Sequence, residues 1–309
     1  MGFRLKCEYE KIRPMKADLM KYIFLSMRPE QWIKNFFVFT ALLFSKNLLN
    51  PAKDIEAIIG FIIFCMITGC TYVINDLVDL EKDKLHPTKS RRPLASGKVK
   101  KGTAVKIIVL IGLVSLFFAF YMNILFGISI LAYFLLNIGY SIYLKNIVII
   151  DVVSIAAGFV LRVLGGAVII SVVASQWLIL CTILLSLFLG FSKRRHELIL
   201  LEDSATSHRS VLEHYSPYFL DQMISVVTAS TLICYALYTM SKDTIEKLGT
   251  SKLIYTIPFV LYGIFRYLYL VHQKEEGGSP TEIMFTDKPM IINICLWVIS
   301  SVVFIYVVH

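Results

Sequence analysis

The sequence predicts an all-α integral membrane protein, a bundle of about nine transmembrane helices, and three observations support this fold class. The chain has 309 residues, 57% of them hydrophobic, with a mean hydropathy of +0.69. Only 17% of the residues are charged, against about a quarter in soluble domains. The apolar residues fall into successive blocks of roughly 17–23 residues, the length that a helix needs to cross a hydrocarbon core of about 30 Å.

The predicted spans follow one another without an intervening soluble domain. In chain order they are 35–49, 55–74, 104–121, 123–142, 148–170, 175–192, 222–240, 253–271 and 290–308. The first span is short, and the amphipathic stretch that starts near Asp18 continues into it. Residues 1–309 are therefore expected to form a single membrane domain, with an N-terminal segment at 1–34 and a nine-helix bundle at 35–308.

Basic residues are distributed asymmetrically between the two ends of this bundle. The segments 1–34, 75–103, 143–147, 193–221 and 272–289 hold 23 Lys and Arg residues, while the segments on the other side hold five. Lys and Arg accumulate on the cytoplasmic side of inner or plasma membrane proteins, so we expect a multi-pass protein with a cytoplasmic N-terminus. The two longest connections, 75–103 and 193–221, are then both cytoplasmic and are expected to carry the chemistry.

Two other classes of function are not expected from the composition. The net charge is +9, but the basic residues flank apolar blocks, where they fix orientation in the lipid bilayer rather than bind nucleic acid. None of the six cysteines belongs to a CxxC pair, and all but Cys7 lie inside apolar blocks. A disulfide framework or a zinc site is therefore not expected.

The strongest chemical signal follows the second span, where Asn75, Asp79 and Asp83 are spaced by four residues, with Asp76 beside them. On a helix this spacing places three oxygen donors along one face. Mg²⁺ is bound in this way by one or two carboxylates together with substrate phosphates. The alternative interpretation is a solvated helix end with charges one turn apart.

A basic stretch follows these acidic residues, from His86 to Gly97, and contains Lys89 and Arg92. Guanidinium and ammonium groups next to metal-binding carboxylates are suited to a diphosphate. The lysines just beyond, at 98, 100 and 101, fit an ordinary cytoplasmic basic cluster equally well.

The order of these motifs resembles the UbiA superfamily of intramembrane prenyltransferases. The resemblance rests on NxxxDxxxD followed by HPxKxxRPLASG, and it continues at Tyr140 and Lys145, with Asp151 six residues further on. It covers nearly the whole chain. The resemblance implies a helical bundle with a cytoplasm-facing active site, a Mg²⁺ cofactor, and substrate contacts by these later residues.

A narrower resemblance comes from Arg28-Pro-Glu-Gln-Trp-Ile-Lys34-Asn35, just before the first span. This segment is similar to the decaprenyl-phosphate phosphoribosyltransferase branch of the superfamily. The resemblance implies that Lys34 and Asn35 contact phosphate or ribose of 5-phosphoribosyl 1-diphosphate, and that a polyprenyl phosphate is the acceptor. From the residues alone, Trp32 and Lys34 fit membrane-interface anchors equally well.

One departure from the superfamily pattern supports the same branch. Most members carry a second DxxxD motif after the sixth span, but this chain has Lys193, Arg194 and Glu197 there. The two basic residues suit an additional phosphate monoester, and Glu197 is a candidate for contacting the metal or a hydroxyl. The alternative is a basic cytoplasmic loop without a substrate role.

Arg162 lies deep inside a predicted span, where an arginine is costly and usually faces a polar interior. Asp151 precedes it by eleven residues, close to three helical turns, so the two share a face. A structural brace to Asp151 or to backbone and a substrate contact are both consistent with this position.

The function expected from these features is Mg²⁺-dependent transfer of phosphoribose to a polyprenyl phosphate. The first alternative keeps the fold but transfers a prenyl group from a prenyl diphosphate to an aromatic or other acceptor. The second alternative is a lipid transporter without catalysis, which would need charged residues near the middle of several spans. Association into a homo-oligomer stays open.

Overall fold

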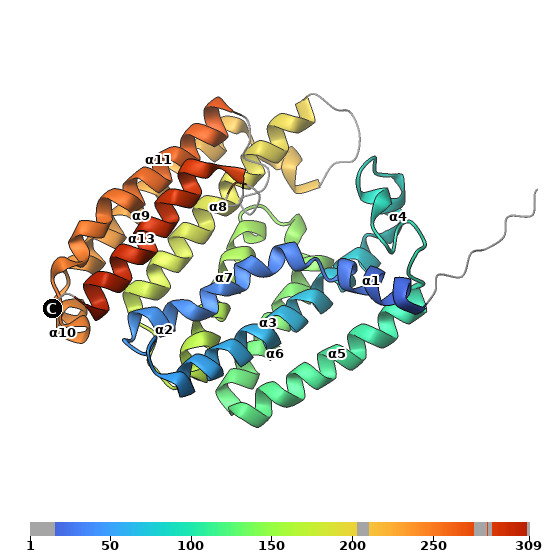
Figure 1. The fold of residues 1–309 in the computed structure, drawn as a ribbon. Coiled ribbons are helices and arrows are strands. Elements are labelled where there is room, and N and C mark those ends of the chain that lie inside the picture. The colour runs from blue at the N-terminus through green and yellow to red at the C-terminus, as the bar shows by residue number, and fades with distance from the viewer. Residues whose placement is uncertain (1–15, 203–209, 275–282, 284–285, 308–309) are drawn as a thin grey trace, which may run out of the picture.

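The computed structural model describes residues 16–202, 210–274, 283 and 286–307, and these are helical without strands (Figure 1). Parts of the segments 1–34, 193–221 and 272–289 expected at the cytoplasmic end therefore lie outside the described residues. Within the described part, eight helices are long and apolar enough to cross a membrane. The chain is a multi-pass membrane protein, as the sequence predicts.

The eight long helices match the second to ninth predicted spans. They are α3 (Pro51–Val78), α5 (Lys101–Met122), α6 (Ile124–Ile142), α7 (Ile150–Ile169), α8 (Gln176–Glu202), α9 (Pro217–Met240), α11 (Ile257–Gln273) with the 3₁₀ turn η5 (Lys252–Thr256) before it, and α13 (Lys288–Tyr306). The shorter elements are α1 (Lys16–Ser26), η1 (Pro29–Phe39), α2 (Thr40–Phe44), α4 (Leu80–Leu85), η2 (Lys89–Arg91), η3 (Leu144–Asn146), η4 (Ser210–His214) and α10 (Lys242–Leu248).

The first predicted span, 35–49, differs from the structure. The chain runs here as an eleven-residue 3₁₀ helix, η1, followed by the five-residue helix α2, and turns at 45–50. A 3₁₀ helix rises about 2.0 Å per residue, so the two elements together cover about 30 Å, as a full span would. Contacts support this: Arg28 pairs with Asp76 at one end, and Leu42 and Leu43 accept hydrogen bonds from Tyr306 at the other.

The spacing of buried residues explains why this segment is a 3₁₀ helix. The buried residues of η1, Asn35 and Val38, are three residues apart. A 3₁₀ helix has three residues per turn, so these two side chains lie one above the other and face the bundle interior. An α-helix would rotate the same residues progressively away from the interior.

Helices α3 and α7 occupy the centre of the bundle. In each of these two helices, 61% of the most apolar 18-residue stretch is buried. The corresponding share is 22% in α5 and α13, which expose large apolar side chains outward. Helix α7 packs on α3, α6, α8 and η1. At Gly166 the backbone of α7 comes so close to Val38 that an added Cβ would lie 2.1 Å from the Val38 carbonyl oxygen.

Helix α8 continues well past the predicted end of its span at 192. Lys193, Arg194 and Glu197 therefore lie on a helix and not in the loop expected at 193–221. These residue types favour helices, and Arg194 and Glu197 are additionally tied together one turn apart. The helical extension places Arg194 against Asp151 at the start of α7, with Glu197 bound to Arg194.

The close approach at Gly166 gives a stability prediction. Gly166→Ala should lower the melting temperature in detergent, because the new methyl group meets backbone that cannot rotate away; overpacking costs about 1–3 kcal/mol. Gly112→Ala in α5 is the control, since nothing lies within 4 Å of its added Cβ. Equal melting temperatures for the two variants would contradict the packing of η1 on α7.

Candidate functional site

The acidic residues recognised in the sequence lie at one end of α3. Asp76 is in the last turn of α3, Asp79 is the residue at which α3 ends, and Asp83 lies in α4 just beyond. Tyr72, one turn before Asp76, lies on the same face. Asp76 and Asp83 are both buried, so each carboxylate needs a charged partner.

Two arginines from outside the central helices supply partners for the buried carboxylates. Arg28 pairs with Asp76 from the residue before η1, where its backbone is left-handed with φ 51°. Arg92 donates from the basic connection to Asp76 at 3.2 Å and to Asp83 at 2.5 Å. The predicted basic residue Arg92 is thus part of the acidic site, and Arg28 joins it.

Lys145 joins the third carboxylate from the connection between α6 and α7. Its ammonium donates to both oxygens of Asp79, at 2.8 and 3.0 Å, and Lys145 is 9% exposed. These contacts complete a group defined here as the first cluster: Arg28, Asp76, Asp79, Asp83, Arg92 and Lys145. Three carboxylates and three cations balance one another in it.

A second cluster surrounds the start of α7 and comprises Tyr140, Asp151, Arg194, Glu197 and Tyr215. Arg194 is 1% exposed, and its guanidinium donates to Asp151 at 2.6 Å, to Tyr140 at 3.1 Å and to Glu197. Lys193 lies 3.9 Å from Glu197 at the exposed side. The second cluster therefore has a buried arginine at its centre, bound by both of its acids.

Tyr215 connects the second cluster to a strained backbone position. Its hydroxyl donates to Asp151 at 2.8 Å and accepts the backbone N–H of Ile149 at 2.7 Å. Ile149 has φ 68°, a conformation that a β-branched residue adopts only when its surroundings impose it. Burial raises the pKa of the Tyr215 phenol, and its hydrogen bond to Asp151 adds to the effect, so the phenol stays a donor at neutral pH.

Deeper in the bundle, Arg162 is bound by three groups of the protein. Its guanidinium donates to Asn35 at 2.7 Å, to Tyr133 at 2.6 Å and to the Gly158 carbonyl at 3.0 Å. Asp151 instead pairs with Arg194, so of the two braces considered from the sequence only the backbone brace is present. Arg162 holds η1 against α7 through Asn35.

Lys34 lies between this interior network and the first cluster. It is partly buried, and the charges of Arg162 and Arg28 both act on it. Among the described residues, no carboxylate forms an ion pair with it. Arg28, Lys34 and Arg162 are neighbours, and among the described residues the carboxylate paired with them is that of Asp76. The resulting local excess of positive charge favours an anion.

Other predicted residues lie less centrally. Lys89 is exposed on η2. Asn75 lies in the last turn of α3, and its side chain makes no hydrogen bond within the described residues. Asp79 and Asp83 turn toward different cations, and the described part of the chain contains no group of three or more His, Cys, Asp or Glu arranged to hold a metal.

The donor chemistry at the end of α3 nevertheless fits Mg²⁺. This ion takes hard oxygen ligands and needs only one or two carboxylates when substrate phosphates supply the rest. Asp79 and Asp83 offer two carboxylates near the cations of the first cluster, and Asn75 offers an amide oxygen.

Sequence reasoning missed three contributors to the site. Tyr72 lies under the Arg28 guanidinium, which is 5.0 Å from the centre of its ring, and its spacing of four from Asp76 could have identified it. Arg28 belonged to a recognised motif but was not assigned a role. Tyr215 follows a connection with no motif of its own, so no local signal could have found it.

Comparisons with known proteins identify the family and the fold of this chain. A family model described as the UbiA prenyltransferase family matches residues 35–286. Decaprenyl-phosphate phosphoribosyltransferase of Corynebacterium glutamicum is 30% identical, over 97% of this chain and 91% of that protein, and the Mycolicibacterium smegmatis protein of the same name is 29% identical, over 91% of each chain. A UbiA homologue from Archaeoglobus fulgidus, solved bound to GPP and Mg²⁺, superimposes with a TM-score of 0.70 at 20% identity, covering 93% of this chain and 100% of that one.

The contacts of Tyr215 lead to a prediction on stability. Tyr215→Phe should lower the free energy of unfolding by about 1–3 kcal/mol, because it leaves Ile149 N–H and one Asp151 oxygen without their partner. Tyr218→Phe is the matched control, since Tyr218 is 75% exposed. Thermal unfolding in detergent would measure both; no difference between them would show that Tyr215 does not hold the second cluster.

Proposed function

Because this chain belongs to the UbiA prenyltransferase family, we propose that it transfers 5-phosphoribose from 5-phosphoribosyl 1-diphosphate to a polyprenyl phosphate. The names of its relatives from Corynebacterium glutamicum and Mycolicibacterium smegmatis support this reaction. The observation that carries it here is the surplus of positive charge around the acidic residues. Among the described residues, Lys34 forms no ion pair with a carboxylate, and it lies near two further cations, Arg28 and Arg162. Arg194 and Lys193 add basic residues at the second cluster, where most members of the superfamily carry a second DxxxD motif.

The first cluster binds the diphosphate of the donor in this proposal. Arg28, Arg92 and Lys145 already converge there, and each can exchange a carboxylate for a phosphate oxygen. Asp79, Asp83 and Asn75 would hold Mg²⁺, which neutralises the charge that develops on the leaving diphosphate. Mg²⁺ would then take the place of the cations that Asp79 and Asp83 release, so these two carboxylates would avoid the main cost of opening an ion pair.

The donor's 5-phosphate requires further cations, and two lysines are candidates. Lys34 lies beside the first cluster, and Lys193 lies on the exposed side of the second. Asn35 and Arg162 fix η1 and so position Lys34. Tyr140 and Asp151 orient Arg194, while Asp76 and Lys89 complete the charged surroundings of the diphosphate.

The reaction exchanges one bond at ribose C1. An oxygen of the lipid phosphate forms a bond to C1, and the C1–O bond to the diphosphate breaks, with its electron pair leaving on the diphosphate. The nucleophile is already an anion, so the protein needs no strong general base. Positioning of the two phosphates and stabilisation of the leaving group carry most of the rate.

The family assignment also supports a second candidate. UbiA prenyltransferases transfer a prenyl group, so the same acidic residues could bind a prenyl diphosphate and alkylate an aromatic or other acceptor. This candidate requires no site for an additional phosphate, which separates it from the first.

The orientation in the membrane is part of the proposal. Both clusters lie at the end of the bundle that carries 23 of the basic residues, against five at the other end. This asymmetry supports an inner or plasma membrane protein with its N-terminus and its site at the cytoplasmic face.

The role of the acidic residues predicts a loss of turnover on charge removal. Asp79→Asn or Asp83→Asn should abolish transfer, since loss of such electrostatic stabilisation commonly costs about 10²–10³ in rate. Glu81→Gln is the control: Glu81 lies on α4, is exposed, and within the described residues pairs only with Lys84. EDTA should mimic the loss and Mg²⁺ restore it. Full activity after chelation would remove the metal from the mechanism.

Removal of the donor's 5-phosphate tests the proposed function itself. Ribosyl 1-diphosphate should react about ten- to a hundredfold more slowly, because a charge-assisted contact is worth about 1.5–3 kcal/mol. Lys34→Ala or Lys193→Ala should reduce this discrimination, whichever lysine holds the phosphate. Lys106→Ala, exposed on α5, should leave it unchanged. Equal rates with the two donors in the unmodified protein would refute a 5-phosphate site.

A further inference from the structure

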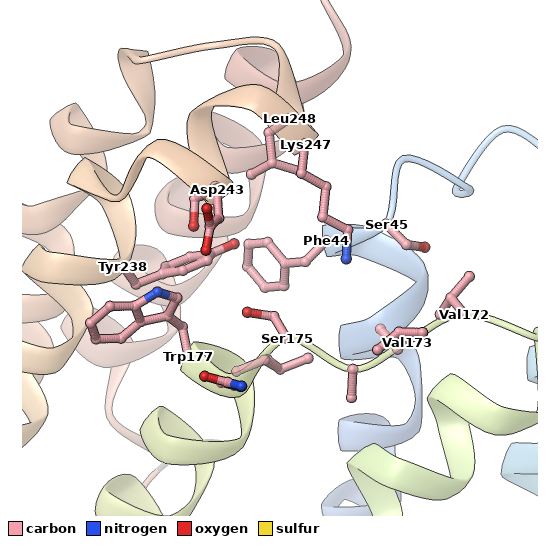
Figure 2. Close-up of a pocket in the computed structure, with 15 residues that line it drawn as sticks. Phe44, Ser45, Val172, Val173, Ser175, Trp177, Tyr238, Asp243, Lys247 and Leu248 are labelled. Carbon is pink, nitrogen blue, oxygen red and sulfur yellow. The ribbon is translucent and has the colours of Figure 1, made fainter.

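A cavity of about 310 Å³ lies at the end of the bundle opposite to both clusters (Figure 2). The end of α2, the segment 172–178 that opens α8, and the end of α9 with α10 enclose it. Its volume is at the lower limit of small-molecule sites, which suits a head group rather than a whole lipid. Neither cluster contributes a residue to it.

Three aromatic rings from three elements line the cavity: Phe44, Trp177 and Tyr238. Phe44 meets Tyr238 edge to face, with ring centroids 5.9 Å apart. Figure 2 shows these rings and the carboxylate of Asp243 pointing toward one another. Aromatic residues that merely anchor a protein at the membrane interface face the lipid, whereas Tyr238 is only 8% exposed.

Three polar groups that line the cavity have no partner within the described residues. In the described part of the chain, no hydrogen bond or ion pair engages the Tyr238 hydroxyl, the Trp177 indole N–H or the Asp243 carboxylate. The Tyr238 hydroxyl has no partner but is not fully enclosed by protein atoms, so it opens into the cavity. Lys247, one turn after Asp243, lines the cavity on the far side of Phe44 and likewise forms no ion pair.

Aromatic faces beside a carboxylate attract an ammonium group, and a nearby lysine attracts a phosphate. Asp243 and Lys247 stand one helical turn apart on α10, and their charged groups line the cavity on opposite sides of Phe44. This is the charge pattern of an aminoalkyl phosphate. Large apolar side chains at this end are exposed, among them Val173 at the cavity itself, and they would contact acyl chains.

We propose that this cavity binds the head group of a zwitterionic phospholipid from the membrane leaflet at this end. The ammonium lies between Phe44, Tyr238 and Asp243, and the phosphate lies toward Lys247. A lipid held there connects α2 with α8 and α10. The proposal does not depend on the chemistry at the other end of the bundle.

Native mass spectrometry of the whole protein in detergent tests this site, with phosphatidylethanolamine and phosphatidylglycerol titrated separately. The unmodified protein should retain phosphatidylethanolamine about tenfold more strongly. Asp243→Asn should remove this preference, since a charge-assisted contact is lost. Glu246→Gln is the matched control, because Glu246 is an exposed acid on the same helix outside the cavity. Equal retention of the two lipids, or an unchanged preference in Asp243→Asn, overturns the proposal.

A competition arm separates a lipid from a free ligand of the same chemistry. Soluble O-phosphoethanolamine, added in excess, should fail to displace the lipid, because it lacks the acyl chains that Val173 contacts. Displacement by this excess overturns the lipid assignment. Melting temperatures of the variants without added lipid should match, which shows that Asp243→Asn acts on binding and not on folding.

Discussion

The structure depends on pairing charges that are buried at one end of an apolar bundle. A carboxylate in this environment is strongly destabilising unless a cation and hydrogen bonds compensate it. Asp76 meets this requirement with Arg28, which precedes it in the sequence, and with Arg92, which follows it. Asp151 meets it with Arg194 and Tyr215, from helix α8 and from the connection before α9. These pairs join segments that are distant in the sequence.

The same pairing explains why the chain enters the bundle as a 3₁₀ helix. Arg28 fixes the start of η1 at Asp76, and Arg162 fixes its middle through Asn35. Between these points, one residue in three must face α3 and α7, which is the period of a 3₁₀ helix. The crossing therefore combines a structural role with the placement of Lys34 beside the first cluster.

Much of the fold could be predicted from the sequence, because apolar blocks of sufficient length must cross the membrane as helices. The eight long helices follow this rule. The first crossing is an exception. Its high apolar content hides the three-residue spacing of its buried side chains, so the sequence alone does not predict a 3₁₀ helix there. The end of α8 was also missed: hydropathy falls at Lys193, but ion pairing and helix propensity continue the helix.

Site residues whose charges lie close together in the sequence could be predicted. Their partners from distant segments of the chain could not. Asp79 and Arg92 belong to dense local patterns, but their actual partners, Lys145 and Asp83, follow from the fold. Tyr215 carries no local signal at all.

The central claim is that these paired charges form a site for 5-phosphoribosyl 1-diphosphate. Its most direct test is to incubate the purified protein and Mg²⁺ with donor labelled in the ribose and with polyprenyl phosphate, and in parallel with labelled prenyl diphosphate and an aromatic acceptor. The account predicts that the ribose label enters the organic phase and that prenyl diphosphate is not consumed. Ribose label that stays in water, while the prenyl group is transferred, would contradict it.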